Sequence, residues 1–135
     1  TKTAFITKDI LREALQRGSN GRKTKILNRS DIAGKTGTVE NFTRINGVRT
    51  QLTDHSVFIA FAPVEDPKIA LAVYIEHGYY GARYAGHIAS LMIEKYLKDS
   101  ITRTDLETRM LTKTLDREYA KPISGAPFRI NEYAW

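Results

Sequence analysis

The dipeptide Asn46-Gly47 is the feature that most constrains how this chain can fold. Both residues tolerate positive φ angles, and an Asn-Gly pair between two strand-like segments is the strongest short-range signal of a β-hairpin. Residues 31–45 lead into the turn, and residues 48–62 return from it. We therefore expect two antiparallel strands joined at Asn46-Gly47.

The second half of the returning strand leads through a turn into a third predicted strand. Residues 57–62 (VFIAFA) are apolar at every position, which suits a strand in a sheet that is covered on both faces. Residues 63–67 begin and end with proline and predict a turn. Between Lys68 and Glu76 large apolar residues alternate with Ala70, Ala72 and Tyr74. The pattern predicts a three-stranded antiparallel meander.

Helical patterns flank these strands, so the predicted fold class is α+β, a three-stranded antiparallel meander flanked by helices. Thr7 can cap a first short helix. Residues 82–98 predict an amphipathic helix that covers the sheet, and residues 105–119 a weaker one. On the 82–98 helix one polar stripe recurs at helical spacing, and we expect its His87 at the surface. The stripe consists of Arg83, His87, Ser90, Glu94 and Lys98. The tail after Pro122 is expected to be irregular.

Composition excludes several classes of protein. The 135 residues suffice for one domain or less, and the lack of cysteine excludes disulfides and thiolate metal sites. The three histidines show no metal-ligand spacing, so we expect no metal or other cofactor. No segment approaches the roughly 20 apolar residues of a membrane span, so any anchor is expected outside this chain.

The net charge of +6 lies entirely in residues 1–30, which hold eight Lys or Arg residues against Asp9 and Glu13. Such a segment allows an alternative interpretation, in which the chain is a basic binding module for nucleic acid or for an anionic wall polymer. The plainer interpretation is a solvated helix and turn.

Residues 33–38 (AGKTGT) form a polar, glycine-rich stretch inside the first strand pattern. A phosphate-binding loop would need a glycine where Arg29 stands and a helix after the motif. Residues 39–45 instead continue as a strand, so the phosphate-loop interpretation fails on both counts. A strand with a bulge at the glycine and an exposed lysine remains the structural alternative.

The same stretch is suited to binding an extended peptide that ends in a carboxylate, by β-augmentation. Lys35 supplies positive charge, Gly37 leaves room for the ligand, and the hydroxyls of Thr36 and Thr38 can donate to the carboxylate. A backbone N–H near Thr38 can serve an oxyanion hole. Strand alternation places Lys35 and Gly37 on one face and the threonines on the other. All four can reach one ligand only at the edge of the sheet.

Four segments in series carry a family resemblance, namely residues 31–40, 54–63, 67–76 and 88–97. In order and spacing they resemble the class B, high-molecular-weight penicillin-binding proteins of the penicillin-binding protein 2-like group, over roughly residues 5–100. The resemblance implies the last three strands of a five-stranded sheet with helices on both faces. It also implies a peptidoglycan D,D-transpeptidase at the periplasmic face of the bacterial inner membrane, with D-Ala-D-Ala stem peptides and β-lactams as ligands. By residue-to-residue match, Lys35 is catalytic, and Thr36, Gly37 and Thr38 bind substrate.

The chain departs from the family pattern in several places. No Ser-x-x-Lys or Ser-x-Asn occurs, so we expect the chain alone to be inactive and the nucleophile to come from a missing N-terminal part. His87 stands where the family usually has proline, and the Asn46-Gly47 hairpin is longer than usual. We expect residues 1–102 to be an incomplete C-terminal portion of the domain, and residues 103–135 a helix and tail. The strand at 68–76 would leave an open edge and favour self-association.

Overall fold

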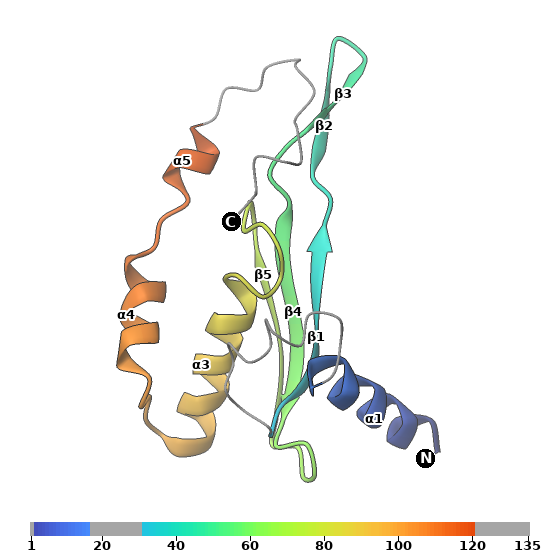
Figure 1. Cartoon of the computed structure of the whole chain (residues 1–135), viewed down its shortest axis with the longest axis vertical. Coiled ribbons are helices and arrows are strands. Elements are labelled where there is room, and N and C mark those ends of the chain that lie inside the picture. Colours follow the sequence, from blue (N-terminus) through green and yellow to red (C-terminus); the bar gives the residue numbers. More distant parts are fainter. Residues whose placement is uncertain (1, 17–30, 121–135) are drawn as a thin grey trace.

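The computed structural model describes residues 2–16 and 31–120, and its architecture is α+β, as predicted (Figure 1). The helices are α1 (Lys2–Gln16), α3 (Ala85–Lys98), α4 (Thr104–Thr112) and α5 (Asp116–Tyr119). The strands are β1 (Ala33–Val39), β2 (Phe42–Ile45), β3 (Val48–Gln51), β4 (His55–Ala62) and β5 (Ile69–Ile75). The tail after Pro122, which we expected to be irregular, lies outside the described residues.

The main sheet has the antiparallel order β1-β4-β5, which confirms the predicted meander. Its register pairs Lys35 with Ile59 and Ser56 with Ile75. The turn residues Asn46 and Gly47 have φ angles of 50° and 82°, as a two-residue hairpin turn requires. Strands β2 and β3 form a ladder of their own, so the hairpin extends beyond the sheet as a separate two-stranded arm (Figure 1).

One face of the sheet packs on α3 and forms the core. The core side chains of β4 occupy alternate positions, and Phe58 is fully buried among Ala85, Ala89 and Ile93 of α3. The predicted apolar face of β5 packs against the same cluster through Ile69, Leu71, Val73 and Ile75. Burial of large apolar side chains contributes about 1.5–3 kcal/mol each, so this layer holds the sheet to α3.

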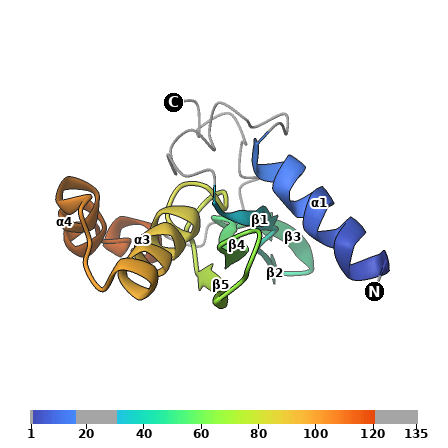
Figure 2. The ribbon, with the colours of Figure 1, turned by 90° about the horizontal axis from the view of Figure 1, so that it is seen from below.

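The opposite face of the sheet is covered only in part, by α1. Viewed from below, α1 and α3 lie on opposite faces of the sheet, as the family resemblance implied (Figure 2). Leu15 of α1 is buried in the core, and Lys8 and Arg12 form ion pairs with Glu65 in the turn after β4. Ile59 is nevertheless 46% exposed and Tyr74 is 51% exposed. The expectation that residues 57–62 are covered on both faces therefore holds for one face only.

The prediction that His87, in the polar stripe of α3, lies at the surface is wrong. His87, Ser90 and Glu94 are 6%, 0% and 2% exposed, because α4 and the segment before it pack over this side of the helix. Glu94 can be buried because the hydroxyl of Thr102 and the guanidinium of Arg103 donate hydrogen bonds to it. Met92 and Tyr96 of the same helix are exposed and do not contribute to covering the sheet.

The predicted helix at 105–119 is divided into α4 and α5 by an extended residue, Lys113. None of the helices in the described ranges is long and apolar enough to span a bilayer.

Candidate active site

The residues from Lys35 to Thr38 lie in the middle of β1, at the edge of the main sheet. Within the described residues, β1 pairs with β4 along one side and with no strand along the other. The structure thus meets the condition set by strand alternation, since a ligand at this edge can reach both faces of β1. An extended peptide could add to the sheet here by main-chain hydrogen bonds.

The register assigns the four side chains to two faces. Lys35 and Gly37 lie opposite Ile59 and Val57, and directly opposed residues of an antiparallel pair share a face. Lys35 therefore projects on the incompletely covered face, away from α3. Its side chain is exposed, and its Nζ atom donates to the carbonyl oxygen of Thr36 at 2.7 Å. With no carboxylate paired to it in the described part of the chain, the ammonium is available to a ligand.

The other two side chains lie on the α3 face of β1. Thr36 and Thr38 are opposed to Phe58 and Ser56, and Thr36 is half-buried while Thr38 is exposed. The structure therefore brings the four predicted site residues together along one edge, as two pairs on opposite faces.

The two glycines of the motif have different structural roles. A Cβ at Gly34 would lie 2.3 Å from the carbonyl oxygen of Ile59, so close packing against β4 requires glycine there. A Cβ at Gly37 would only meet Val57 at an ordinary 3.5 Å. The fold of the described residues does not require glycine at position 37. Its missing side chain leaves this part of the strand uncovered.

A third glycine, Gly81, lies outside the motif and packs directly against the backbone of β1. A Cβ at Gly81 would lie 2.2 Å from the carbonyl oxygen of Val57 and 2.6 Å from that of Gly37. Residues 77–84 therefore pack tightly on the backbones of β1 and β4. Ser56 fastens the same loop, since its hydroxyl donates to the Tyr80 carbonyl at 3.1 Å and accepts from the Ala85 N–H at 3.3 Å. Fully buried and engaged in this way, Ser56 is a structural residue and not a nucleophile.

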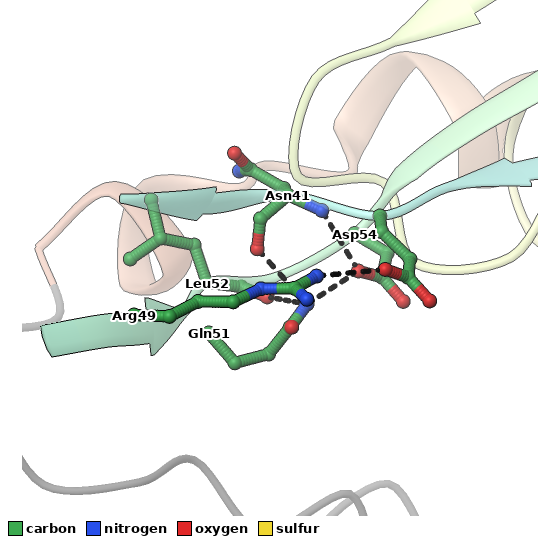
Figure 3. Close-up of polar contacts among 6 residues, drawn as sticks. Asn41, Arg49, Gln51, Leu52 and Asp54 are labelled. Carbon is green, nitrogen blue, oxygen red and sulfur yellow. Dashed lines mark hydrogen bonds and ion pairs between the residues drawn. The ribbon is translucent and has the colours of Figure 1, made fainter. Parts of the chain in front are cut away.

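A polar network at the base of the hairpin fixes the end of β1 (Figure 3). Asp54 Oδ1 accepts from the Asn41 N–H at 3.1 Å and from Gln51 Nε2 at 2.9 Å, and Gln51 Nε2 also donates to the Asn41 carbonyl at 2.9 Å. Arg49 pairs with Glu40 at 2.9 Å. These contacts hold the arm rigidly to the residues that follow Thr38.

Sequence reasoning missed both supports of the strand. Gly81 and Asp54 are distant from Gly37 in sequence, and only the fold brings their roles to light. The available signals were weak: Asp54 opens the second of the four family-like segments, and Gly78 and Gly81 stand together before the helix. His55 and His77 lie with ring centroids 5.5 Å apart near this end of the sheet. Among the described residues, no group of three or more histidine or acidic side chains could hold a metal ion.

Residues 1–95 match the family model described as the penicillin-binding protein transpeptidase domain. The chain belongs to this family. The match spans the motif strand, its supports and most of α3, and it gives no support to the alternative of a basic binding module.

Several curated relatives carry corresponding names. The chain is 28% identical over 92 residues to the peptidoglycan D,D-transpeptidase MrdA of Haemophilus influenzae, which covers 63% of this chain and 14% of the relative. It is 40% identical over 60 residues to the probable peptidoglycan D,D-transpeptidase PenA of Neisseria gonorrhoeae, which covers 42% of this chain and 10% of the relative. The chain therefore spans only a small part of the curated relatives it matches. No solved structure gives a significant match.

Proposed function

We propose that this chain is the substrate-binding portion of a peptidoglycan D,D-transpeptidase, which cross-links cell-wall peptides by acyl transfer. In this proposal Lys35 is a catalytic residue, and Thr36, Gly37 and Thr38 bind the D-Ala-D-Ala end of a stem peptide or a β-lactam. The observation that carries the proposal is the edge position of the motif strand, with an exposed ammonium and a glycine that packing does not require.

The nucleophile in this proposal comes from a segment outside the sequence. A serine followed three residues later by lysine does not occur in the chain, and Ser56 is buried in a structural role. The incompletely covered face supports the same idea, because Lys35 projects on the face where Ile59 and Tyr74 are exposed. A domain part that covers this apolar face would bring its own side chains next to Lys35. Residues 1–102 would belong to the transpeptidase domain and residues 103–135 would follow it.

Titration of the isotopically labelled chain with a peptide ending in D-Ala-D-Ala tests substrate binding. We expect the amide resonances of residues 35–39 to shift, and the same peptide with an amidated C-terminus to shift them far less, because the terminal carboxylate is lost. Gly37→Val should abolish the shifts, since a side chain now occupies the edge of β1. Ala72→Val, at an exposed position of β5, is the matched control and should leave them intact. Shifts spread over the whole chain, or equal for the amidated peptide, would contradict the proposal.

Incubation with a labelled penicillin tests the location of the nucleophile. We expect no covalent adduct on the 135-residue chain, because acylation requires an activated serine. A stoichiometric adduct detected by mass spectrometry would show that a residue of this chain is the nucleophile. Since a peptidoglycan transpeptidase acts where its substrate lies, we also propose a periplasmic location.

Self-association through β5 is a further part of the proposal. Among the described strands β5 pairs only with β4, which leaves its outer edge as a template for another copy. We expect concentration-dependent dimers in sedimentation velocity, and loss of those dimers when Ala72→Lys places a charge on the edge strand. A strictly monomeric profile of the unmodified chain at high concentration would refute this part alone.

A further inference from the structure

A cavity of about 230 Å³ lies between the start of α3, the loop before it and the end of α4, and none of its lining residues belongs to β1. This volume is several times the roughly 30 Å³ that one water molecule occupies in the liquid. Its walls combine aromatic rings with basic side chains and contain no carboxylate. The lining residues are Tyr80, Ala82, Arg83, Tyr84, His87, Arg109, Met110 and Lys113.

The imidazole of His87 is the buried polar group of this cavity. It is 6% exposed, and its Nδ1 atom lies 2.8 Å from the carbonyl oxygen of Arg83. Because a carbonyl only accepts, Nδ1 carries a proton, and the neutral ring presents a bare lone pair at Nε2. Nε2 is buried and has no hydrogen-bond partner within the described residues. Buried polar atoms are rarely left in this state, so the atom calls for a partner.

The charges around His87 identify the kind of partner. Arg109 of α4 and Lys113, the first residue after α4, line the cavity, and neither forms an ion pair in the described part of the chain. From the loop before α3, Arg83 is stacked on Tyr79, with its guanidinium carbon 4.2 Å from the ring centroid. The nearby carboxylate of α3, Glu94, is already bound by Thr102 and Arg103. The cavity therefore carries a net positive potential.

We propose that this cavity is a binding site for a small oxyanion, a phosphoryl or carboxylate group, held by His87, Arg109 and Lys113. A bound oxyanion accepts from Nε2 once His87 has taken up a second proton, and it neutralises the charges of Arg109 and Lys113. The position of His87 in the first turn of α3 adds to the attraction, because the helix dipole favours an anion there. This site is independent of the proposed peptide-binding strand.

The site also makes binding depend on pH. Burial, together with the nearby Arg109 and Arg103, lowers the pKa of His87 in the free protein, against the hydrogen bond to the Arg83 carbonyl, which raises it. An oxyanion beside Nε2 favours the protonated ring and so raises that pKa again. Binding should therefore strengthen as the pH falls through the pKa of the complex.

Titration of the full chain with inorganic phosphate at constant ionic strength tests the proposal, with the His87 ring resonances as the readout. We expect saturable binding, an upward shift of the His87 pKa, and roughly fivefold weaker binding in either Arg109→Gln or Lys113→Gln. Lys98→Gln and Arg117→Gln remove exposed charges outside the cavity and should change binding little. Acetate and citrate in parallel titrations distinguish a carboxylate site from a phosphate site. Lys35→Met should have no effect, which separates this site from the proposed transpeptidase function.

Three outcomes would overturn the proposal. Binding that weakens equally in Lys98→Gln and in Arg109→Gln would mean attraction to net charge only. A His87 pKa unchanged at saturating phosphate would place the anion elsewhere. Failure of phosphate, acetate and citrate alike to give a saturable shift would leave Nε2 with ordered water as its partner. Arg109 and Lys113 are exposed, so their substitution should leave the fold intact and keep the test decisive.

Discussion

β1 and α3 both carry a row of polar residues, and the structure treats the two rows in opposite ways. On β1, Lys35 and Thr38 are exposed at an open edge, and no described carboxylate pairs with the lysine. On α3, the row from His87 to Glu94 is buried beneath α4, and Glu94 is fully engaged. Exposed polar groups that packing does not need are suited to a ligand, whereas buried ones must first be satisfied inside the protein. The difference distinguishes the residues that we propose bind a substrate from the residues that stabilise the fold.

The sharpest test of this distinction sets Gly81 against Gly37. Gly81→Ala should destabilise the chain by about 3 kcal/mol, because the new methyl group would overlap the backbone of Val57 and Gly37. Gly37→Ala should be neutral or stabilising by about 0.5 kcal/mol, since alanine is favoured over glycine inside a strand. Urea denaturation of the two variants measures both effects. Equal destabilisation would mean that glycine 37 is required by the fold and not by a ligand.

The strands were predicted correctly from the sequence, whereas the burial of the polar side chains on α3 was not. The Asn-Gly turn and the alternation in β5 are local patterns, and local chemistry decides them. The burial of the α3 stripe depends on α4, which follows α3 in the chain, and on Arg103 just before α4, which pairs with Glu94. Helical periodicity identifies a polar side but does not reveal what covers it. The four proposed site residues could be selected from the sequence because they are contiguous, whereas the supporting roles of Gly81 and Asp54 depend on long-range packing.

Glu94 should contribute stability that depends on pH. Burial alone would raise its pKa, but hydrogen bonds from Thr102 and Arg103 outweigh that effect and lower the pKa to about 2. A depressed carboxyl pKa stabilises the folded state above the ordinary value of 4.5, and this contribution is lost as the pH falls toward 2. Glu94→Gln should cost about 2 kcal/mol at pH 7 and progressively less in acid.

Glu65→Gln is the matched control for Glu94→Gln, because Lys8 and Arg12 also lower the pKa of Glu65, but at an exposed site. Its effect on chemical denaturation should be too small to measure. A Glu94→Gln variant as stable as the parent at neutral pH would mean that the attraction between Glu94 and Arg103 only offsets the cost of burying the two charges.

Asp54 combines features of the polar rows on β1 and α3. It is half-buried and hydrogen-bonded inside the protein, as the α3 row is, but it lies next to the motif strand β1. Asp54→Ala should cost about 1 kcal/mol, because it removes the acceptor shared by Asn41 and Gln51. Hydrogen exchange should accelerate in residues 42–51 more than in β4, since the arm is held through this network. Asp105→Ala, at an exposed position of α4, is the control. Uniform acceleration over the sheet would show that the arm has no separate stability.

Lys35→Met should have the smallest effect on stability, below about 0.5 kcal/mol, because within the described residues the exposed ammonium bonds only to the carbonyl of Thr36. The same change should abolish the resonance shifts caused by the D-Ala-D-Ala peptide, since the positive charge near the carboxylate is lost. Lys68→Met, an exposed lysine in the turn before β5, should alter neither quantity. A residue of an open binding edge should leave the free energy of unfolding unchanged when it is replaced, but should be required for peptide binding. If Lys35→Met unfolded the chain, Lys35 would be a structural residue like those buried on α3. If the variant bound the peptide unchanged, the lysine would have no part in peptide binding.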